Sequence, residues 1–315
     1  MRILFMGTPD FAVPSLNALV ENGYEVAGAV TQVDRPRDRG HSLKASPVKE
    51  YAIKHNIPVY QPVKLSREPE LIGTLEELRP DLIVTCAFGQ ILPKSVLDIP
   101  RLGTINVHGS LLPKYRGAAP IQWAVINGEA KTGITTMFTD IGVDTGDMLL
   151  QDEIEISDNM TAGELHDIMS LQGAKTLVRT LEELEKGNLV RTKQDESQAT
   201  YAPKIVKSTG CIDWTQTSRK IHDLIRGTTP WPGAFSCFCG CRARIWHSEL
   251  ADENRALSCE ASPGTILSLD NSGMLVKTGD GVLLISEIQV DSCRRMTPGQ
   301  YACGHELKAG ICFDV

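Results

Sequence analysis

The first thirty residues constrain the fold of this chain most, because they alternate between two kinds of hydrophobic pattern. Residues 2–7 (RILFMG) form a short apolar run, a helical pattern follows from residue 10 to residue 20, and residues 24–31 return to a strand pattern. A strand, a helix and a second strand in this order are the opening of a parallel sheet. We therefore predict an α/β fold with a Rossmann-like parallel sheet.

The turn after the first strand argues against one common use of such a sheet. Residues 7–10 are Gly-Thr-Pro-Asp, without the three glycines that let a pyrophosphate approach the backbone in dinucleotide-binding proteins. The sequence therefore argues against an NAD-linked oxidoreductase.

The alternating pattern continues to about residue 189 and then changes. In this N-terminal domain (residues 1–189), further strands are expected at 59–63, 81–87, 104–108, 134–138 and 148–156, and helices at 47–55, 69–78, 118–127 and 161–186. Residues 190–205 are polar and lack periodicity, which predicts a linker. In residues 206–315, one helix (218–226) precedes short strands at 234–238, 242–248, 264–269, 274–278 and 281–290. Short strands at close spacing favour a small OB-like β-barrel.

The composition is that of a globular protein large enough for two domains. The 315 residues carry a formal net charge of −7, and no apolar run reaches the roughly 18 residues of a membrane span. The N-terminus has no secretory signal pattern, so we expect a cytoplasmic protein. A nucleic-acid partner would need a local basic patch, because the overall charge opposes phosphate.

Nine cysteines are present, and all except Cys86 lie at residue 211 or beyond. Their spacing is not that of a disulfide framework, which suggests a reducing compartment. Cys237, Cys239 and Cys241 follow a Cys-X-Cys pattern that lacks the Cys-X-X-Cys spacing of structural zinc sites. We expect ordinary strand cysteines and no metal.

Two polar side chains lie on one face of the predicted strand 104–108. Residues i and i+2 of a strand point to the same side, so Asn106 and His108 project together. A Gly-Ser pair follows, so the strand ends there, and the carboxyl ends of strands in open α/β sheets face the ligand crevice. An amide beside an imidazole suits attack on a carbonyl, because the amide can hold the oxyanion while the imidazole takes the proton.

The residues around this pair resemble a known family. Asn-Val-His-Gly-Ser-Leu-Leu-Pro-Lys-Tyr-Arg-Gly (residues 106–117), followed by Asp-Ile-Gly-Val-Asp-Thr-Gly (residues 140–146), resembles the signature of the 10-formyltetrahydrofolate-dependent formyltransferases. Within that family, Arg-Gly-Ala-Ala-Pro-Ile-Gln-Trp (residues 116–123) is similar to the members that act on methionyl-tRNA. The resemblance implies transfer of a formyl group from 10-formyltetrahydrofolate to the amino group of methionyl-initiator-tRNA, for initiation of translation. It implies no membrane and no obligate protein partner.

The resemblance also implies roles for individual residues. Asn106 and His108 would act on the formyl group, and Asp144 would lie against the His108 ring. The residues that would bind the folate are Ser110, Leu111, Leu112, Pro113, Phe88, Ile91 and Asp140. Phe88 and Ile91 could equally be simple core residues. The acidic loop 140–147 could be a plain turn or a weak calcium site, although it lacks the EF-hand pattern.

A long stretch without hydrophobic periodicity separates the second strand from the next helix. Residues 32–49 carry five basic and two acidic side chains, which gives +5 − 2 = +3. A charged loop of this kind is often only a solvated surface, but loops this long within a domain are usually functional or disordered. The resemblance implies that this loop enters the acceptor arm of the tRNA, with Arg39, Arg35 and Lys44 in contact with RNA.

Other functions stay open at this stage. A formyltransferase for a small amine, such as a sugar nucleotide, would share Asn106, His108 and Asp144 without needing the basic loop or the barrel. A 10-formyltetrahydrofolate hydrolase would use water as the nucleophile, and an RNA-binding protein with an inactive α/β domain would show no turnover. The intact run at residues 116–122 favours tRNA as the acceptor.

Overall fold

The computed structural model describes residues 1–36, 43–251 and 261–314, and the chain divides into two compact units. The first unit comprises residues 1–117, 132–154 and 166–202. The second unit comprises residues 118–131, 155–165 and 203–315. Two stretches from the first 165 residues of the chain, 118–131 and 155–165, therefore pack with its C-terminal part.

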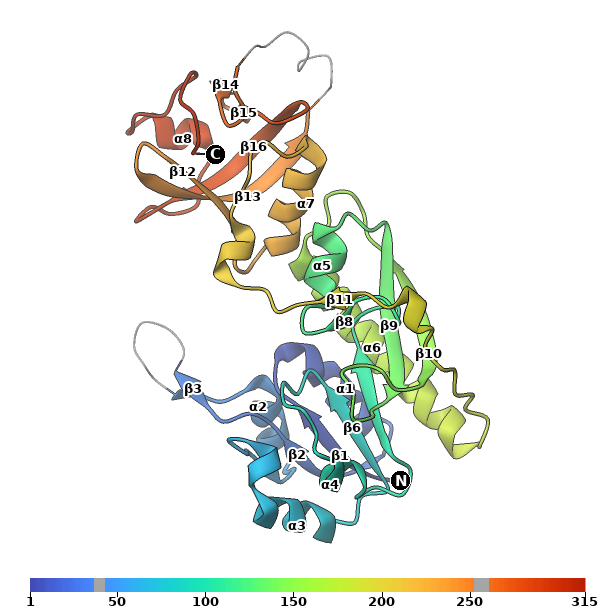
Figure 1. Cartoon of the computed structure of the whole chain (residues 1–315). Coiled ribbons are helices and arrows are strands. Elements are labelled where there is room, and N and C mark those ends of the chain that lie inside the picture. Colours follow the sequence, from blue (N-terminus) through green and yellow to red (C-terminus); the bar gives the residue numbers. More distant parts are fainter. Residues whose placement is uncertain (37–42, 252–260, 315) are drawn as a thin grey trace. The chain divides into compact units, whose positions relative to one another are not determined.

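A seven-stranded sheet forms the centre of the first unit, in the order β10-β9-β7-β6-β1-β2-β5. Its strands are β1 (Arg2–Gly7), β2 (Glu25–Val30), β5 (Val59–Tyr60), β6 (Leu82–Cys86), β7 (Thr104–His108), β9 (Lys131–Phe138) and β10 (Met148–Glu155). The strands from β7 to β5 in this order are mutually parallel, and β9 runs antiparallel to β7. The predicted Rossmann-like α/β sheet is confirmed, and β1, β2 and β6 can be followed side by side in Figure 1.

Helices follow most of these strands, and their starts are visible in the sequence. They are α1 (Val13–Glu21), α2 (Pro47–Lys54), α3 (Pro69–Glu77), α4 (Lys94–Leu97) and α6 (Ala162–Glu185). At the start of α2, the Ser46 hydroxyl accepts a hydrogen bond from Lys49 N and a proline occupies the first helical position. All five residues of β6 are buried, as expected of a central parallel strand.

The second unit contains a five-stranded antiparallel sheet, in the order β12-β13-β16-β15-β14. The strands are β12 (Ala234–Phe238), β13 (Cys241–Leu250), β14 (Ile266–Asp270), β15 (Gly273–Lys277) and β16 (Val282–Val290), and the helices are α5 (Pro120–Ile126), α7 (Ser218–Thr228) and α8 (Pro298–Ala302). The fold class predicted for the C-terminal part is confirmed.

The end of the chain links the two edge strands of this sheet. Cys312 forms a bridge with Thr265, next to β14, and Asp314 N donates to Cys237 O of β12 at 2.7 Å. Phe313, between them, is buried and stacks on Trp214 with ring centroids 5.1 Å apart. The C-terminal segment therefore closes the sheet around its core in the manner of an OB-like barrel.

Four very short strands occur in stretches for which we predicted no regular structure. β3 (Arg35–Pro36) pairs with β4 (Leu43–Lys44) in the basic loop, and β8 (Arg116–Gly117) pairs in parallel with β11 (Tyr201–Ala202), within the predicted linker. Two residues are too few to produce a hydrophobic period, so such strands depend on pairing between distant parts of the chain.

Candidate active site

Asn106 and His108 lie at the carboxyl end of β7, where the sheet changes from parallel to antiparallel pairing. Asn106 is in register with Thr85 of β6, and His108 is in register with Thr135 of β9. Because they are two residues apart on one strand, their side chains point to the same side of the sheet.

The amide of Asn106 is oriented by its neighbour on β6. The Thr85 hydroxyl donates to Asn106 Oδ1 at 2.9 Å. The amide nitrogen Nδ2 is therefore the group left to donate, and no described residue accepts a hydrogen bond from it. The residue is half-buried.

The ring of His108 is buried, and its tautomer follows from one contact. Nε2 lies 3.0 Å from the carbonyl oxygen of Tyr115, which can only accept, so Nε2 carries a proton. In the neutral ring, Nδ1 therefore holds the lone pair. Nδ1 faces Asp144 Oδ2 at 3.7 Å, which is too long for a hydrogen bond but suits an ion pair once the ring is protonated.

Asp144 comes from the loop between β9 and β10 and has a rarely adopted backbone conformation. Its φ is +54°, in the left-handed region. Its Oδ2 atom accepts a hydrogen bond from Gly117 N at 2.8 Å. The carboxylate is thus aimed toward β7, and the structure brings Asn106, His108 and Asp144 together.

The turn after β7 is held by internal hydrogen bonds. Ser110 is buried and its hydroxyl donates to Lys114 O at 2.6 Å, so this hydroxyl shapes the turn. Thr135 Oγ1 donates to Ser110 O at 2.6 Å and accepts from Leu112 N at 3.1 Å. Leu112 is buried, Leu111 and Pro113 are half-buried, and the Leu112–Pro113 peptide is cis.

Phe88 and Ile91, predicted as a pair, have opposite environments. Phe88 is 4% exposed and packs in a core cluster with residues that include Leu4 and Met6, whereas Ile91 is 74% exposed. Burial favours the core alternative for Phe88. The exposed side chain of Ile91 is available as an apolar wall for a ligand.

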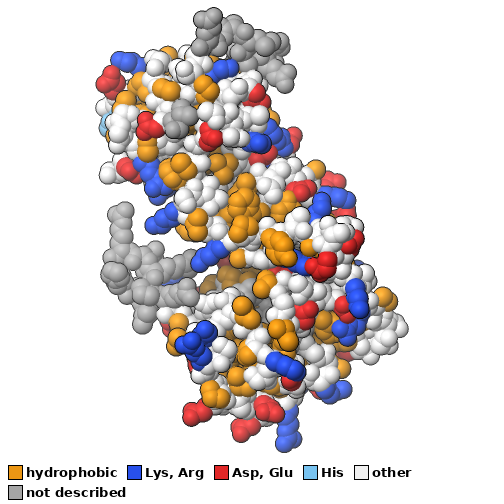
Figure 2. All heavy atoms as spheres, in the orientation of Figure 1, with side chains coloured by type: hydrophobic (Ala, Val, Ile, Leu, Met, Phe, Trp, Pro, Cys, Tyr) orange, Lys and Arg blue, Asp and Glu red, His pale blue; other side chains and the backbone are white. Residues whose placement is uncertain are grey.

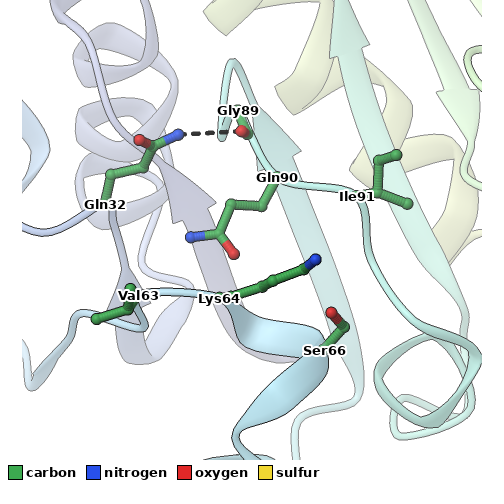
Figure 3. Close-up of a pocket in the computed structure, with 7 residues that line it drawn as sticks. All are labelled: Gln32, Val63, Lys64, Ser66, Gly89, Gln90 and Ile91. Carbon is green, nitrogen blue, oxygen red and sulfur yellow. Dashed lines mark hydrogen bonds between the residues drawn. The ribbon is translucent and has the colours of Figure 1, made fainter.

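Ile91 borders a pocket of about 350 Å³, shown in Figure 3. Its lining residues are Gln32, Val63, Lys64, Ser66, Gly89, Gln90 and Ile91. Gln32 Nε2 donates to Gly89 O at 3.0 Å and thereby joins two of the contributing segments. Lys64 is the charged member of the lining, so the pocket combines amide groups and apolar surface with one cation.

The side chain of Asp140 makes hydrogen bonds within its own loop. Its Oδ1 atom accepts from Gly142 N at 3.0 Å and from the Thr145 hydroxyl at 2.6 Å, and the side chain is exposed. These contacts fix the course of the loop that carries Asp144.

The residues predicted to contact tRNA lie in the basic loop of the first unit. Arg39 lies outside the described residues, and Arg35 and Lys44 form the register pair of β3 and β4. Lys44 is exposed. Lys49 Nζ forms an ion pair with Asp34 Oδ2 at 2.7 Å. The hydrogen bonds from Lys49 and Gln61 lower the pKa of Asp34.

Sequence reasoning missed two residues that hold the loop of Asp144. Arg116 has no exposed surface and donates through Nε to Gln194 Oε1 at 2.9 Å. Gln194 Nε2 in turn donates to the carbonyl oxygens of Asp144 and Gly146, both at 2.8 Å. Arg116 entered the sequence analysis only as part of a motif, and no local pattern marks Gln194.

The described residues contain no group of three or more His, Cys, Asp or Glu side chains that could hold a metal ion. Across the same ranges of the chain, we find no helix long and apolar enough to span a membrane.

The sequence matches two family models that together span most of the chain. The model described as formyl transferase matches residues 1–181, and the one described as formyl transferase, C-terminal domain, matches residues 204–306. The methionyl-tRNA formyltransferase of Acetivibrio thermocellus is 55% identical over 310 residues, which cover 98% of each chain. That of Clostridioides difficile is 50% identical over 311 residues, which cover 99% of each chain.

Solved structures share the fold at much lower identity. An N-formyltransferase from Helicobacter canadensis, in complex with folinic acid and dTDP-3-aminofucose, matches 90% of this chain and 98% of its own with a TM-score of 0.66 and 20% identity. HypX from Aquifex aeolicus, in complex with tetrahydrofolic acid, matches 96% of this chain and 47% of its own with a TM-score of 0.65 and 19% identity.

Proposed function

This chain belongs to the methionyl-tRNA formyltransferase family, and we propose that Asn106, His108 and Asp144 carry out its reaction. The formyl donor is 10-formyltetrahydrofolate, and the acceptor is the amino group of methionine on the initiator tRNA. The reaction takes place in the cytoplasm and supplies translation initiation.

The proposed mechanism needs no covalent enzyme intermediate. The neutral amine attacks the formyl carbon, a C–N bond forms, and the carbonyl electron pair moves to the formyl oxygen. His108 Nδ1 accepts the amine proton, and Asp144 stabilises the imidazolium. Asn106 Nδ2 donates to the oxyanion. The bond between the formyl carbon and folate N10 then breaks, and N10 receives the proton from His108, which leaves tetrahydrofolate and the formylated amine.

The environment of His108 is the observation that carries this assignment. The Tyr115 carbonyl accepts a hydrogen bond from Nε2, so Nδ1 is the ring nitrogen that can take a proton. Nδ1 faces a carboxylate at 3.7 Å, and the donor nitrogen of Asn106 lies on the same side of β7. A base, its counter-charge and an oxyanion donor are the groups that formyl transfer requires.

For the folate, we propose a site bordered by the turn 110–113, the loop of Asp140 and the exposed side chain of Ile91. A flat heterocycle is stabilised by apolar walls such as Ile91 and Leu111, while Ser110 and Asp140 shape the two loops. Phe88 belongs to the core beneath this region of the sheet. The glutamate tail of folate carries carboxylates, and Lys64 is the cation that lines the adjoining pocket. We therefore assign that pocket to the tail.

For the tRNA, we propose two contact regions. The first is the basic loop with Arg35, Arg39 and Lys44. The second is part of the C-terminal domain, residues 206–315. The visible face in Figure 2 mixes basic and acidic side chains, so the acidic chain must bind RNA through local patches.

Within the C-terminal domain, the outer side of β12 and β13 has the chemistry of an RNA-binding face. The Arg242 guanidinium lies 3.6 Å from the Phe235 ring centroid, and the Arg295 guanidinium lies 3.6 Å from the Trp246 ring centroid. Arg244 is in register with Phe235 on the same face. Guanidinium planes and aromatic rings stack on unpaired bases, and arginine also pairs with phosphate.

The deciding experiment is formyl incorporation from 10-formyltetrahydrofolate, with charged initiator tRNA, free methionine and a sugar-nucleotide amine as parallel acceptors. We expect transfer to the charged tRNA alone. Transfer to the small amine would contradict the proposed acceptor. Folate turnover without any acceptor would instead indicate a hydrolase.

A further inference from the structure

The loop that carries Asp144 is held by one side chain from a distant part of the chain. Gln194 Nε2 donates to the main-chain oxygens of Asp144 and Gly146, each at 2.8 Å. Both hydrogens of this amide are therefore used on the loop. The two carbonyl groups flank the residue after Asp144, so Gln194 fixes the backbone directly behind the carboxylate.

Arg116 fixes the orientation of Gln194. The Arg116 Nε atom donates to Gln194 Oε1 at 2.9 Å, and the terminal nitrogens make a two-pronged pair with Glu196 at 2.8 and 2.9 Å. A guanidinium can only donate, so it requires the amide oxygen of Gln194 on its own side and leaves the amide nitrogen for the loop. Arg116 is fully buried, so its position is closely defined.

The backbone on either side of Arg116 contacts the proposed catalytic side chains directly. Tyr115 O accepts from His108 Nε2 at 3.0 Å, and Gly117 N donates to Asp144 Oδ2 at 2.8 Å. The segment 115–117 therefore holds the imidazole and the carboxylate through its backbone. Through Gln194 it also holds the loop on which the carboxylate is carried.

Asp144 needs such support because of its backbone conformation. A φ of +54° is uncommon for residues other than glycine, although aspartate adopts it more readily than most, and surrounding contacts help to hold it. Two hydrogen bonds hold Asp144 in this conformation. Gln194 donates to its main-chain oxygen, and Gly117 N donates to its carboxylate.

We propose that Gln194, Arg116 and Glu196 are positioning residues that set the distance between Asp144 and His108. The inference rests on the proposed roles of Asp144 and His108. It adds a hydrogen-bonded group, Gln194, Arg116 and Glu196, that supports Asp144 from outside the substrate site. Without the Gln194 amide, the two loop carbonyls lose their donor, and Asp144 shifts away from Nδ1. The imidazolium formed during the reaction then loses its counter-charge, so the loss falls on kcat.

The test compares two glutamines of the same segment in the full-length enzyme. Gln194→Met keeps the length of the side chain but removes its donors. Gln198→Met is the matched control, because Gln198 Nε2 donates to the exposed Asp195 carboxylate and not to the loop. For Gln194→Met we expect kcat to fall by about 10–100-fold, with each KM within about threefold of wild type in the folded enzyme. Gln198→Met should behave like wild type.

A wild-type kcat in Gln194→Met, or an equal loss in both variants, overturns the proposal. If Gln194→Met does not fold, Glu196→Gln decides, because the Glu196 side chain is 70% exposed and tolerates change. That variant should lose about two- to tenfold in kcat; a normal kcat overturns the proposal. A wild-type enzyme that fails to formylate methionyl-tRNA would instead overturn the proposed function.

Discussion

His108 Nδ1 and Asp144 Oδ2 lie 3.7 Å apart, beyond hydrogen-bond distance but within reach of an ion pair. The tautomer of the ring is set by the Tyr115 carbonyl on Nε2, so Asp144 is not needed for that purpose. The Asp144 carboxylate can therefore stabilise the protonated His108 ring, whose charge develops only as the reaction proceeds. Selection of the tautomer and stabilisation of the charge are therefore separate tasks, and Asp144 performs only the second.

Asp144→Asn should lower kcat while leaving both substrates bound. Asparagine keeps the shape and can still accept from Gly117 N, but it gives no charge to the imidazolium. We expect kcat to fall by about 10–100-fold and each KM to change little. Steady-state kinetics with charged initiator tRNA and 10-formyltetrahydrofolate measure this. An unchanged kcat would exclude the electrostatic role of Asp144.

Asn106→Ala should cost about 10²–10³ in kcat, as removal of one oxyanion donor usually does. Thr85→Val is the matched milder change, because it removes only the hydroxyl that orients the Asn106 amide. One lost hydrogen bond of about 1 kcal/mol predicts roughly a fivefold loss for Thr85→Val. Single-turnover formylation rates at saturating substrates would show both. Equal rates for Asn106→Ala and wild type would rule out the oxyanion assignment.

The features that the sequence predicted correctly are local ones. The strand 104–108 and the i, i+2 placement of Asn106 and His108 follow from five consecutive residues, and hydrophobic periods located most other strands and helices. The hydrogen bonds that support Asp144 join residues far apart in the sequence. Arg116 and Gln194 are 78 residues apart, and a polar stretch without periodicity gives no sign of which partner it will meet.

The absence of a local pattern also explains why no strand was predicted within the expected linker. Residues 190–205 lack a hydrophobic period, yet Tyr201 and Ala202 pair with Arg116 and Gly117 as β11 and β8. Arg116 N also donates to Thr200 O at 2.8 Å. Main-chain pairing of this kind uses groups that every residue has, so composition cannot reveal it. Only the structure shows that this polar stretch lies against the proposed active site.

Lys64→Met should weaken the proposed binding of the folate tail. The variant keeps an unbranched side chain in the pocket but removes its cation. We expect the KM for 10-formyltetrahydrofolate to rise by about two- to fivefold, because a single exposed charge pair contributes about 1 kcal/mol or less. The KM for tRNA and the kcat should stay close to wild type. Lys54→Met, at an exposed position of α2, is the control. An equal effect of the two variants would show that general charge is responsible.

The buried His222 should make the second unit sensitive to acid. Burial lowers the pKa of His222, whose Nε2 donates to Asp158 O and whose Nδ1 contacts the Ser248 hydroxyl. Arg226 and Arg219 nearby lower this pKa further, while Asp223 raises it. The folded ring therefore binds a proton only below the ordinary value of about 6.5, at which the unfolded chain already binds one. Stability contributed by the neutral ring is fully present above that value and is lost as the pH falls from it through the lower pKa of the folded ring.

His222→Gln tests this sign, because glutamine can keep a donor and an acceptor but does not titrate. Wild type should lose more stability than the variant between about pH 7.5 and pH 5. Denaturant unfolding followed by tryptophan fluorescence measures this, because all four tryptophans, including Trp214 in the core, belong to the second unit. Parallel pH profiles for the two proteins would show that His222 is not responsible.

The outer face of β12 and β13 should govern the salt dependence of tRNA binding. Arg244→Ala removes one cation that can pair with phosphate, and Trp246→Ala removes one ring that can stack on a base. Arg244→Ala should reduce the slope of log affinity against log salt by about 1, whereas Trp246→Ala should weaken binding with little change in slope. Lys308→Ala is the control, because Lys308 is paired with Glu306 on an exposed segment. Filter binding of charged initiator tRNA over a salt series distinguishes the three variants. If Arg244→Ala and Lys308→Ala give the same slope as wild type, RNA does not contact this face.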